Sequence, residues 1–277
     1  MLKYSSANFL KKKYLHYLST QEIHSKPFYN KINQLNNFYL PICEKIYKDY
    51  KKNKKIKIIG LTGGQGAGKS TITQILKLIL EIKYNLKVVF FSIDDFYKTL
   101  SERINLAESV NKLFKIRGVP GTHDTNLIKK TFISLTKKKF RPMLIPRFDK
   151  SRDDRFPKKN WQKIKEQPKI IIFEGWCVGA RSQQNKDLFK TINSLEKKDD
   201  LNLKWRSRVN NELKNAYKKI FIQIDMLIFL KVPSFNCVYK WRLLQEKKLK
   251  LTSKGKKIMS PFQIRKFIMY YERITMQ

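Results

Sequence analysis

The sequence of 277 residues is poor in cysteine and has no long apolar segment. Its three cysteines, Cys43, Cys177 and Cys237, form no CxxC pair, so we expect reduced thiols and neither a disulfide framework nor a zinc site. No run of about 18 apolar residues occurs, so no transmembrane helix is expected. The start of the chain lacks the apolar core of a secretory signal, and the absence of arginine before Arg103 argues against a transit peptide. We therefore expect a cytoplasmic protein without a membrane partner.

Acidic residues are also scarce, since 22 Asp and Glu stand against 60 Lys and Arg, a formal net charge of +38. A charge of this size often indicates a nucleic acid partner. However, 48 of the basic residues are lysines, and they are spread along the chain without an aromatic-interleaved patch. We interpret most of them as solvated surface charge and expect no specific nucleic acid partner. The positive field would still favour an anionic ligand.

The apolar pattern divides the chain near residue 53. Residues 1–52 are predicted to form a helical N-terminal extension, because apolar positions such as Tyr14 and Leu18 recur at helical spacing. In residues 53–277, helical patterns alternate with short apolar runs, which predict strands at 56–61, 87–93, 142–146, 169–175 and 225–231. Runs of this kind are buried on both faces of a parallel sheet, so we predict an α/β, doubly wound fold. The polar stretch 182–208 is predicted to be a loop or an insertion.

The clearest motif is GGQGAGKS at 63–70, which fits the pattern GxxxxGK[ST] between a predicted strand and a predicted helix. In such a P-loop, backbone N–H groups and a helix N-terminus hold phosphates. Lys69 would reach the β- and γ-phosphates, and Ser70 would bind Mg²⁺. The residues expected to bind ATP are Gly63, Gly64, Gln65, Gly66, Ala67, Gly68, Lys69, Ser70 and Thr71.

Two carboxylates, Asp94 and Asp95, follow the second predicted strand in the segment SIDDFY. Ligands of parallel sheets bind at the carboxyl ends of the strands, so both side chains are expected near the phosphates. There, a carboxylate can orient an acceptor hydroxyl and take its proton. One of the two could instead be only a helix cap.

A third acid, Glu174, closes the apolar strand 169–175. An acid in this place beside a P-loop is the Walker B arrangement, so Ser70 and Glu174 are the expected Mg²⁺ ligands and ATP and Mg²⁺ the expected cofactors. A GTPase switch is not expected, because 185–188 read NKDL and not NKxD.

Several segments resemble the kinase group of uridine kinases, phosphoribulokinases and pantothenate kinases, and within it the D-glycerate 3-kinases of plants, fungi and cyanobacteria. They are SIDDFY (92–97), RGVPGTHD (117–124), PRFDKSRDDR (146–155), EGWCVG (174–179), WRLLQE (241–246) and MSPFQIRKFIMYYERIT (259–275). The resemblance implies that Asp94, at the third position of SxDxFY, is the catalytic base. Asp95, Tyr97 and Asp149 are further candidates for contact with the acceptor.

The same segments carry cations that suit an acceptor with a carboxylate. The candidates are Arg117, His123, Lys150 and Arg155, of which the two arginines are favoured because a guanidinium matches a carboxylate bidentately. Each could also be an ordinary surface charge, and His123 a structural histidine. Arg242 lies in a helix after the last predicted strand, where this fold carries a lid, and is expected to close over the phosphates unless it is a surface charge.

These features predict ATP-dependent phosphorylation of a small hydroxylated metabolite, first of all D-glycerate to 3-phosphoglycerate. A nucleoside or pantothenate is the alternative acceptor, and a nucleotide-dependent nucleic-acid-binding protein is the alternative of another class. The resembling family continues past YERIT into a further apolar strand, so the sheet of this chain is expected to lack that strand.

Overall fold

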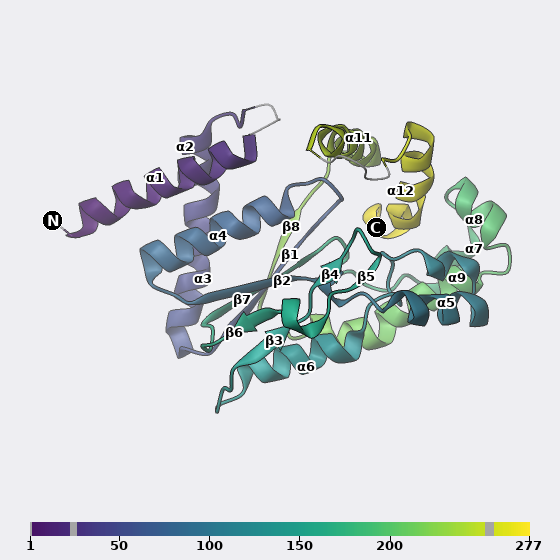
Figure 1. Cartoon of the computed structure of the whole chain (residues 1–277), viewed down its shortest axis with the longest axis horizontal. Coiled ribbons are helices and arrows are strands. Elements are labelled where there is room, and N and C mark those ends of the chain that lie inside the picture. Colours follow the sequence, from purple (N-terminus) through teal and green to yellow (C-terminus); the bar gives the residue numbers. More distant parts are fainter. Residues whose placement is uncertain (1, 23–26, 253–257) are drawn as a thin grey trace.

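The computed structural model describes residues 2–22, 27–252 and 258–277, and a four-stranded parallel sheet lies at its centre (Figure 1). The strand order is β2-β7-β1-β8, with β1 at Lys57–Gly63, β2 at Val88–Ser92, β7 at Ile170–Gly175 and β8 at Met226–Leu230. Ile59 of β1 lies opposite Ile172 of β7 and Met226 of β8. Four of the five predicted strands therefore build the sheet.

Helices cover both faces of this sheet. One face buries Phe91 and Phe173 against α6 (Thr125–Thr136) and α9 (Lys204–Glu212), and the other buries Ile172 against α4 (Lys69–Tyr84). This two-sided cover is the reason why the strands are nearly continuous in apolar residues. The predicted doubly wound α/β architecture is confirmed.

The N-terminal extension is helical at residues 2–22 and 31–53, and residues 27–30 form a loop. The helical residues form α1 (Leu2–Glu22), α2 (Lys31–Gln34), the π-helical turn η1 (Leu35–Tyr39) and α3 (Leu40–Asn53). Tyr14 of α1 and Ile46 of α3 are fully buried in the same core as α4 and β1. The extension is thus packed onto the sheet's α4 side, as α1 lies along α4 in Figure 1.

The segment between β2 and β7 corrects one prediction. It contains the 3₁₀ turns η2 (Ile93–Phe96), η3 (Lys112–Lys115) and η4 (Lys158–Asn160), the helices α5 (Leu100–Ser109) and α6, and two short antiparallel pairs. These pairs are β3 (Met143–Ile145) with β6 (Gln162–Ile164) and β4 (Phe148–Asp149) with β5 (Asp154–Arg155). The prediction that 142–146 joins the central sheet is wrong. Pro142 and Pro146 bound this run and cannot donate to a ladder, which leaves only three residues for pairing.

The segment between β7 and β8 decides between the two predictions for 182–208, a loop or an insertion. The chain forms α7 (Asn185–Phe189), α8 (Ser194–Asp199) and the start of α9 there, followed by η5 (Leu213–Tyr217) and α10 (Lys218–Phe221), so the loop alternative is wrong. Two of its acids are buried: Glu196 accepts hydrogen bonds from Arg273 and forms an ion pair with Arg206. Asp200 accepts from the backbone N–H of Trp205. Hydrophobic periodicity cannot detect helices that are fixed by buried charges.

The last two helices are α11 (Phe235–Thr252) and α12 (Pro261–Thr275), which pack against each other. β8 forms an edge of the sheet, and its Phe229 is 64% exposed. Among the helices in the described ranges, none is long and apolar enough to span a bilayer.

Candidate active site

The P-loop connects β1 to α4 and depends on glycine at two positions. Gly66 and Gly68 have φ angles of 82° and 84°, which L-residues with side chains rarely adopt. Gly66 also faces α11, because a Cβ built on it would lie 2.6 Å from the Cβ of Trp241. Gly68 is the N-cap of α4, so the helix starts with its N-terminus at the loop. An anion held by these N–H groups would benefit from the dipole of α4.

Lys69 folds back over this loop. Its Nζ donates to the backbone carbonyls of Gly63 and Gly64 at 2.9 and 3.0 Å. Burial lowers the pKa of Lys69, while the nearby carboxylates of Glu174 and Asp94 act in the opposite direction. The ammonium therefore lies between the phosphate loop and two acids.

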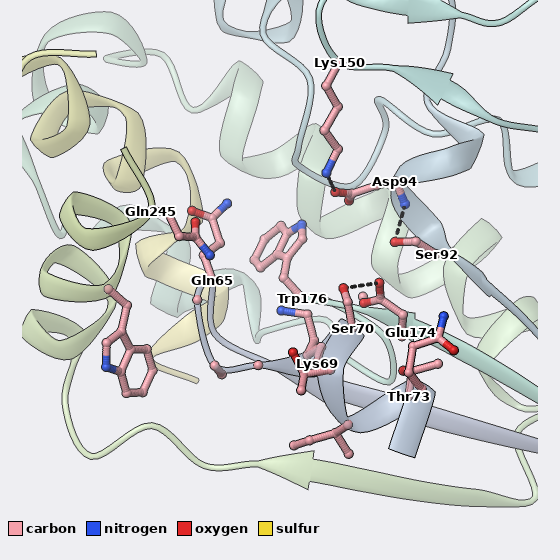
Figure 2. A pocket seen from close by; sticks show the side chains of 18 of the residues that line it. Gln65, Lys69, Ser70, Thr73, Ser92, Asp94, Lys150, Glu174, Trp176 and Gln245 are labelled. Carbon is pink, nitrogen blue, oxygen red and sulfur yellow. Dashed lines mark hydrogen bonds and ion pairs between the residues drawn. The ribbon is translucent and has the colours of Figure 1, made fainter. Parts of the chain in front are cut away.

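Ser70 and Glu174 meet at the carboxyl end of the sheet, where Figure 2 shows them side by side. The Ser70 hydroxyl lies 3.4 Å from a carboxylate oxygen of Glu174, which is itself buried. Burial, and then the charge of Asp94, raise the pKa of Glu174, so an additional cation here would be favourable. No cluster of three His, Cys, Asp or Glu suited to a metal occurs in the described part of the chain. A Mg²⁺ ion needs only one or two protein oxygens beside phosphate and water, and Ser70 and Glu174 fit that requirement.

Asp95 is held by the backbone that surrounds it. With Ser92 it forms a capping box at η2, in which its carboxylate accepts from the Ser92 N–H at 3.3 Å. The other carboxylate oxygen accepts from the N–H of Phe148 at 3.4 Å and lies 3.4 Å from Arg147. Burial raises the pKa of this carboxyl. Asp95 thus fastens the end of β2 to the β4 strand.

Asp94 instead faces other side chains (Figure 2). Tyr97 donates its hydroxyl to one carboxylate oxygen at 2.9 Å, and Lys150 donates to the other at 2.8 Å. Burial alone would raise the pKa of Asp94, but the Lys150 charge and hydrogen bond outweigh it and bring the pKa to about 2. Asp94 is therefore ionised and can only accept hydrogen bonds at neutral pH.

The β4–β5 hairpin carries Lys150 next to Asp94 and contacts a second cation, Arg117. Asp149 caps the turn by accepting from the backbone N–H of Ser151 at 2.9 Å. Arg117 lies over the ring of Phe148, 5.4 Å from its centroid, and pairs with Asp153 in the same hairpin. Asp153 is fixed in turn by Arg103, a fully buried arginine that sequence reasoning did not single out.

Two of the predicted substrate residues lie elsewhere. Arg155 donates to the carbonyl of Tyr97 at 2.8 Å and pairs with Asp124, so its guanidinium is used within the protein. His123 is buried, stacks on Tyr97, and has its Nδ1 2.6 Å from the hydroxyl of Tyr217. Burial lowers its pKa to about 3, so the ring is neutral. Arg155 thus holds the backbone of Tyr97, and His123 holds its ring.

Arg242 reaches the site from α11. Its guanidinium pairs with Glu246 at 2.6 Å, donates to Gln245 at 2.8 Å and lies over the ring of Phe267. Its Nε is buried without a partner. An anion beside α11 would supply one.

A single cavity of about 1260 Å³ connects these groups. The predicted residues that line it are Gln65, Gly66, Ala67, Gly68, Lys69, Ser70, Thr71, Asp94, Asp95, Tyr97, Arg117, Asp149, Lys150, Glu174 and Arg242. Gly63, Gly64, His123 and Arg155 do not line it. Tyr271 of α12 also lines it, with its ring 4.8 Å from that of Trp176. It was not among the predicted site residues, although it stands in the segment 259–275 that carries the family resemblance.

A sequence model described as the Phosphoribulokinase / Uridine kinase family matches residues 58–215, more than half of the chain. The chain belongs to this family. It is therefore an ATP-dependent kinase with the P-loop kinase fold, which confirms the predicted reaction class.

Two kinases and one solved structure are similar to most of this chain. The "Uncharacterized kinase mug58" of Schizosaccharomyces pombe is 35% identical over 242 residues, 83% of this chain and 85% of the relative. The chloroplastic D-glycerate 3-kinase of Arabidopsis thaliana is 28% identical over 86% of this chain, which spans 53% of that protein. A solved structure of D-glycerate 3-kinase from Cryptococcus neoformans matches with a TM-score of 0.70 and 26% identity, covering 88% of this chain and 86% of that chain.

Proposed function

We propose that this kinase transfers the γ-phosphoryl group of MgATP to D-glycerate and forms 3-phosphoglycerate. The observation that carries the proposal is the setting of Asp94, an ionised carboxylate between Tyr97 and Lys150 in the cavity that the P-loop lines. An acceptor hydroxyl that replaces one of these donors would lie against a carboxylate that can take its proton.

The residues of the site divide the work between charge and orientation. Lys69 would move from its carbonyl contacts to the β- and γ-phosphates, as its place in the motif suggests. Mg²⁺, held by Ser70 and Glu174, would neutralise phosphate charge when bound. Asp94 orients the acceptor hydroxyl and accepts its proton as the phosphoryl group arrives, which needs no strong base because the transition state is loose.

The cations near Asp94 favour an acceptor that carries its own carboxylate. Lys150 is already within 2.8 Å of Asp94 and its side chain is 62% exposed, so it can turn toward a second anion. Arg117 is next to it, because its guanidinium lies 3.4 Å from the backbone carbonyl of Lys150. A glycerate carboxylate bound by these two cations would leave its hydroxyl end near Asp94.

Aromatic rings beside the site are occupied by protein contacts, which weighs against a nucleoside acceptor. Trp176 donates to the carbonyl of Gly118 at 3.0 Å and packs edge-on against Tyr271. The ring of Phe148 contacts both Arg117 and Tyr97. The two relatives named D-glycerate 3-kinase support the same acceptor at 26–28% identity.

The test is a panel of acceptors offered singly with MgATP to the purified chain. We expect ADP formation with D-glycerate and none above background with uridine, pantothenate or ribulose 5-phosphate. Turnover of uridine without turnover of D-glycerate would overturn the acceptor and leave the kinase assignment intact.

A further inference from the structure

Tyr271 of α12 lies where the P-loop meets the loop 117–122, which begins with Arg117. The Tyr271 hydroxyl donates to the backbone carbonyl of Arg117 at 3.2 Å. The side chain of Gln65, in the P-loop, is hydrogen-bonded to the same hydroxyl. Tyr271 is 3% exposed and lines the cavity, as Gln65 and Arg117 also do. One side chain therefore bridges two loops that are far apart in the sequence.

The hydroxyl of Tyr271 is protonated and can serve both partners at once. Burial, and then the charge of Asp94, raise the pKa of Tyr271, so the phenol keeps its proton at neutral pH. It gives this proton to the Arg117 carbonyl, and its own lone pairs can accept an N–H of the Gln65 amide. The Oε1 atom of Gln65 is buried without a partner, which agrees with the N–H groups of the amide being the end that meets Tyr271. Phenylalanine at this position would lose both hydrogen bonds.

Glycine at position 118 lets the loop 117–122 come this close. Gly118 has a φ of 145°, and a Cβ built on it would overlap with the Tyr271 hydroxyl. The carbonyl of Gly118 accepts from the indole N–H of Trp176, which follows β7, at 3.0 Å. Trp176 and Tyr271 thus hold the same short stretch of backbone, and Tyr271 connects it to the P-loop.

The ring of Tyr271 has contacts that do not depend on its hydroxyl. It packs edge-on against Trp176 and lies 5.1 Å from the ring of Phe267 in the same helix. Phe267 in turn packs against the guanidinium of Arg242. Because phenylalanine would keep these ring contacts, Tyr271→Phe isolates the two hydrogen bonds of the bridge.

From this arrangement we propose that Tyr271 is a positioning residue that couples nucleotide binding to acceptor binding. Phosphate held by the P-loop fixes Gln65, Gln65 holds the Tyr271 hydroxyl, and this hydroxyl holds the carbonyl of Arg117. The acceptor then meets a loop that is already ordered and loses less conformational freedom on binding. Such coupling is reciprocal, so the acceptor tightens nucleotide binding by the same factor. The proposal rests on the proposed function in one respect, the place of the acceptor beside Arg117.

The first experiment follows the bridge without an acceptor. Amide hydrogen exchange of the purified full chain is measured with and without the non-hydrolysable analogue MgAMP-PNP. The analogue should slow exchange at residues 118–122 about fivefold or more in the unmodified chain, and less than about twofold in Tyr271→Phe. Protection at residues 66–72, which hold the phosphates, should be equal in both chains and shows that the variant is folded and binds nucleotide.

Two further variants complete this experiment. Gln65→Leu breaks the bridge from its other end and should also lose the protection of residues 118–122. Tyr270→Phe is the matched control, because it removes a hydroxyl from the adjacent residue of α12. The ring of Tyr270 packs on Trp205, away from the cavity at the P-loop. This control should behave as the unmodified chain does.

The second experiment adds the acceptor. The dissociation constant of D-glycerate is measured by calorimetry with and without MgAMP-PNP. The analogue should lower this constant about five- to tenfold in the unmodified chain and at most about twofold in Tyr271→Phe. The constant without nucleotide should change by less than about twofold. The double variant Gln65→Leu/Tyr271→Phe should lose no more coupling than either single variant, because both changes break one bridge.

The outcomes separate this proposal from the assignment of D-glycerate. Equal protection of residues 118–122 in Tyr271→Phe and in the unmodified chain, or no protection in either, would overturn the bridge. An unchanged coupling factor in Tyr271→Phe would overturn it as well. Protection that depends on Tyr271, together with no binding of D-glycerate, would support the bridge and overturn the acceptor alone.

Discussion

Asp94 and Asp95 are neighbours in the chain but are held by different groups, and this difference predicts their roles. Asp95 bonds backbone N–H groups of Ser92 and Phe148, whereas Asp94 bonds only movable side-chain donors on its carboxylate. Asp94→Asn should therefore lower kcat by about 10²-fold or more with little change in KM for ATP. Asp95→Asn should mainly lower stability, by about 1 kcal/mol, as expected for a lost cap. Steady-state kinetics and thermal melts of both variants check this, and a larger loss of kcat in Asp95→Asn would reverse the two roles.

Lys150 keeps the pKa of Asp94 at about 2, against the effect of burial. Without this cation, burial dominates and the pKa of Asp94 rises, so the carboxylate becomes protonated at a higher pH as the solution is acidified. Lys150→Ala should consequently move the acid limb of kcat to higher pH. The profile is measured at saturating acceptor, because the same change is expected to raise its KM. Lys163→Ala, an exposed lysine on β6 outside the cavity, should leave the limb in place, and an unmoved limb in Lys150→Ala would contradict the pairing.

Individual residues could be predicted from the sequence only where a local pattern fixes their position. The P-loop and the acids that end β2 and β7 meet this condition, because parallel strands end at one edge of the sheet. Arg155 and His123 stand in equally distinctive segments, but whether they face the cavity depends on partners such as Asp124 and Tyr217, 31 and 94 residues away. Sequence spacing carries no information on contacts of that range.

Among the elements, the P-loop and α11 are linked through Gly66. Gly66→Ala and Gly68→Ala impose a similar cost of about 1–2 kcal/mol, since both positions have left-handed φ angles. Only the methyl group that Gly66→Ala adds would also meet Trp241, whereas nothing lies within 4 Å of a Cβ at position 68. Gly66→Ala should therefore lose about 1–3 kcal/mol more stability than Gly68→Ala. Denaturant unfolding without nucleotide tests this, and equal losses would show that α11 is not in contact with the loop in solution.

The elements that sequence reasoning missed are those fixed by polar contacts or limited by proline. Strands β1, β2, β7 and β8 were predictable because apolar burial on a parallel sheet leaves a direct mark in the chain. The helices within 182–208 were not, since Glu196 and Asp200 are buried polar residues that a hydrophobic pattern assigns to a loop. The run 142–146 was apolar enough for a sheet strand, but Pro142 and Pro146 left it too short.

For the whole molecule, the net charge of +38 and the cavity at the P-loop point to the same kind of ligand. Positive potential focused in a cleft raises the local concentration of anions, which suits both ATP and a carboxylate acceptor. The N-terminal helices, the carboxyl ends of β2 and β7, and α11 all contribute to that cavity. The active site therefore depends on the assembled chain and not on the P-loop segment alone.

The most direct test of this account is phosphorus NMR of one reaction mixture containing the purified chain, MgATP and D-glycerate. We predict a new phosphomonoester resonance coupled to the protons of the primary carbon, growing in step with ADP, and its loss in Asp94→Asn. ADP formation with inorganic phosphate as the only other product, or no reaction with D-glycerate while another acceptor is phosphorylated, would contradict the proposed function.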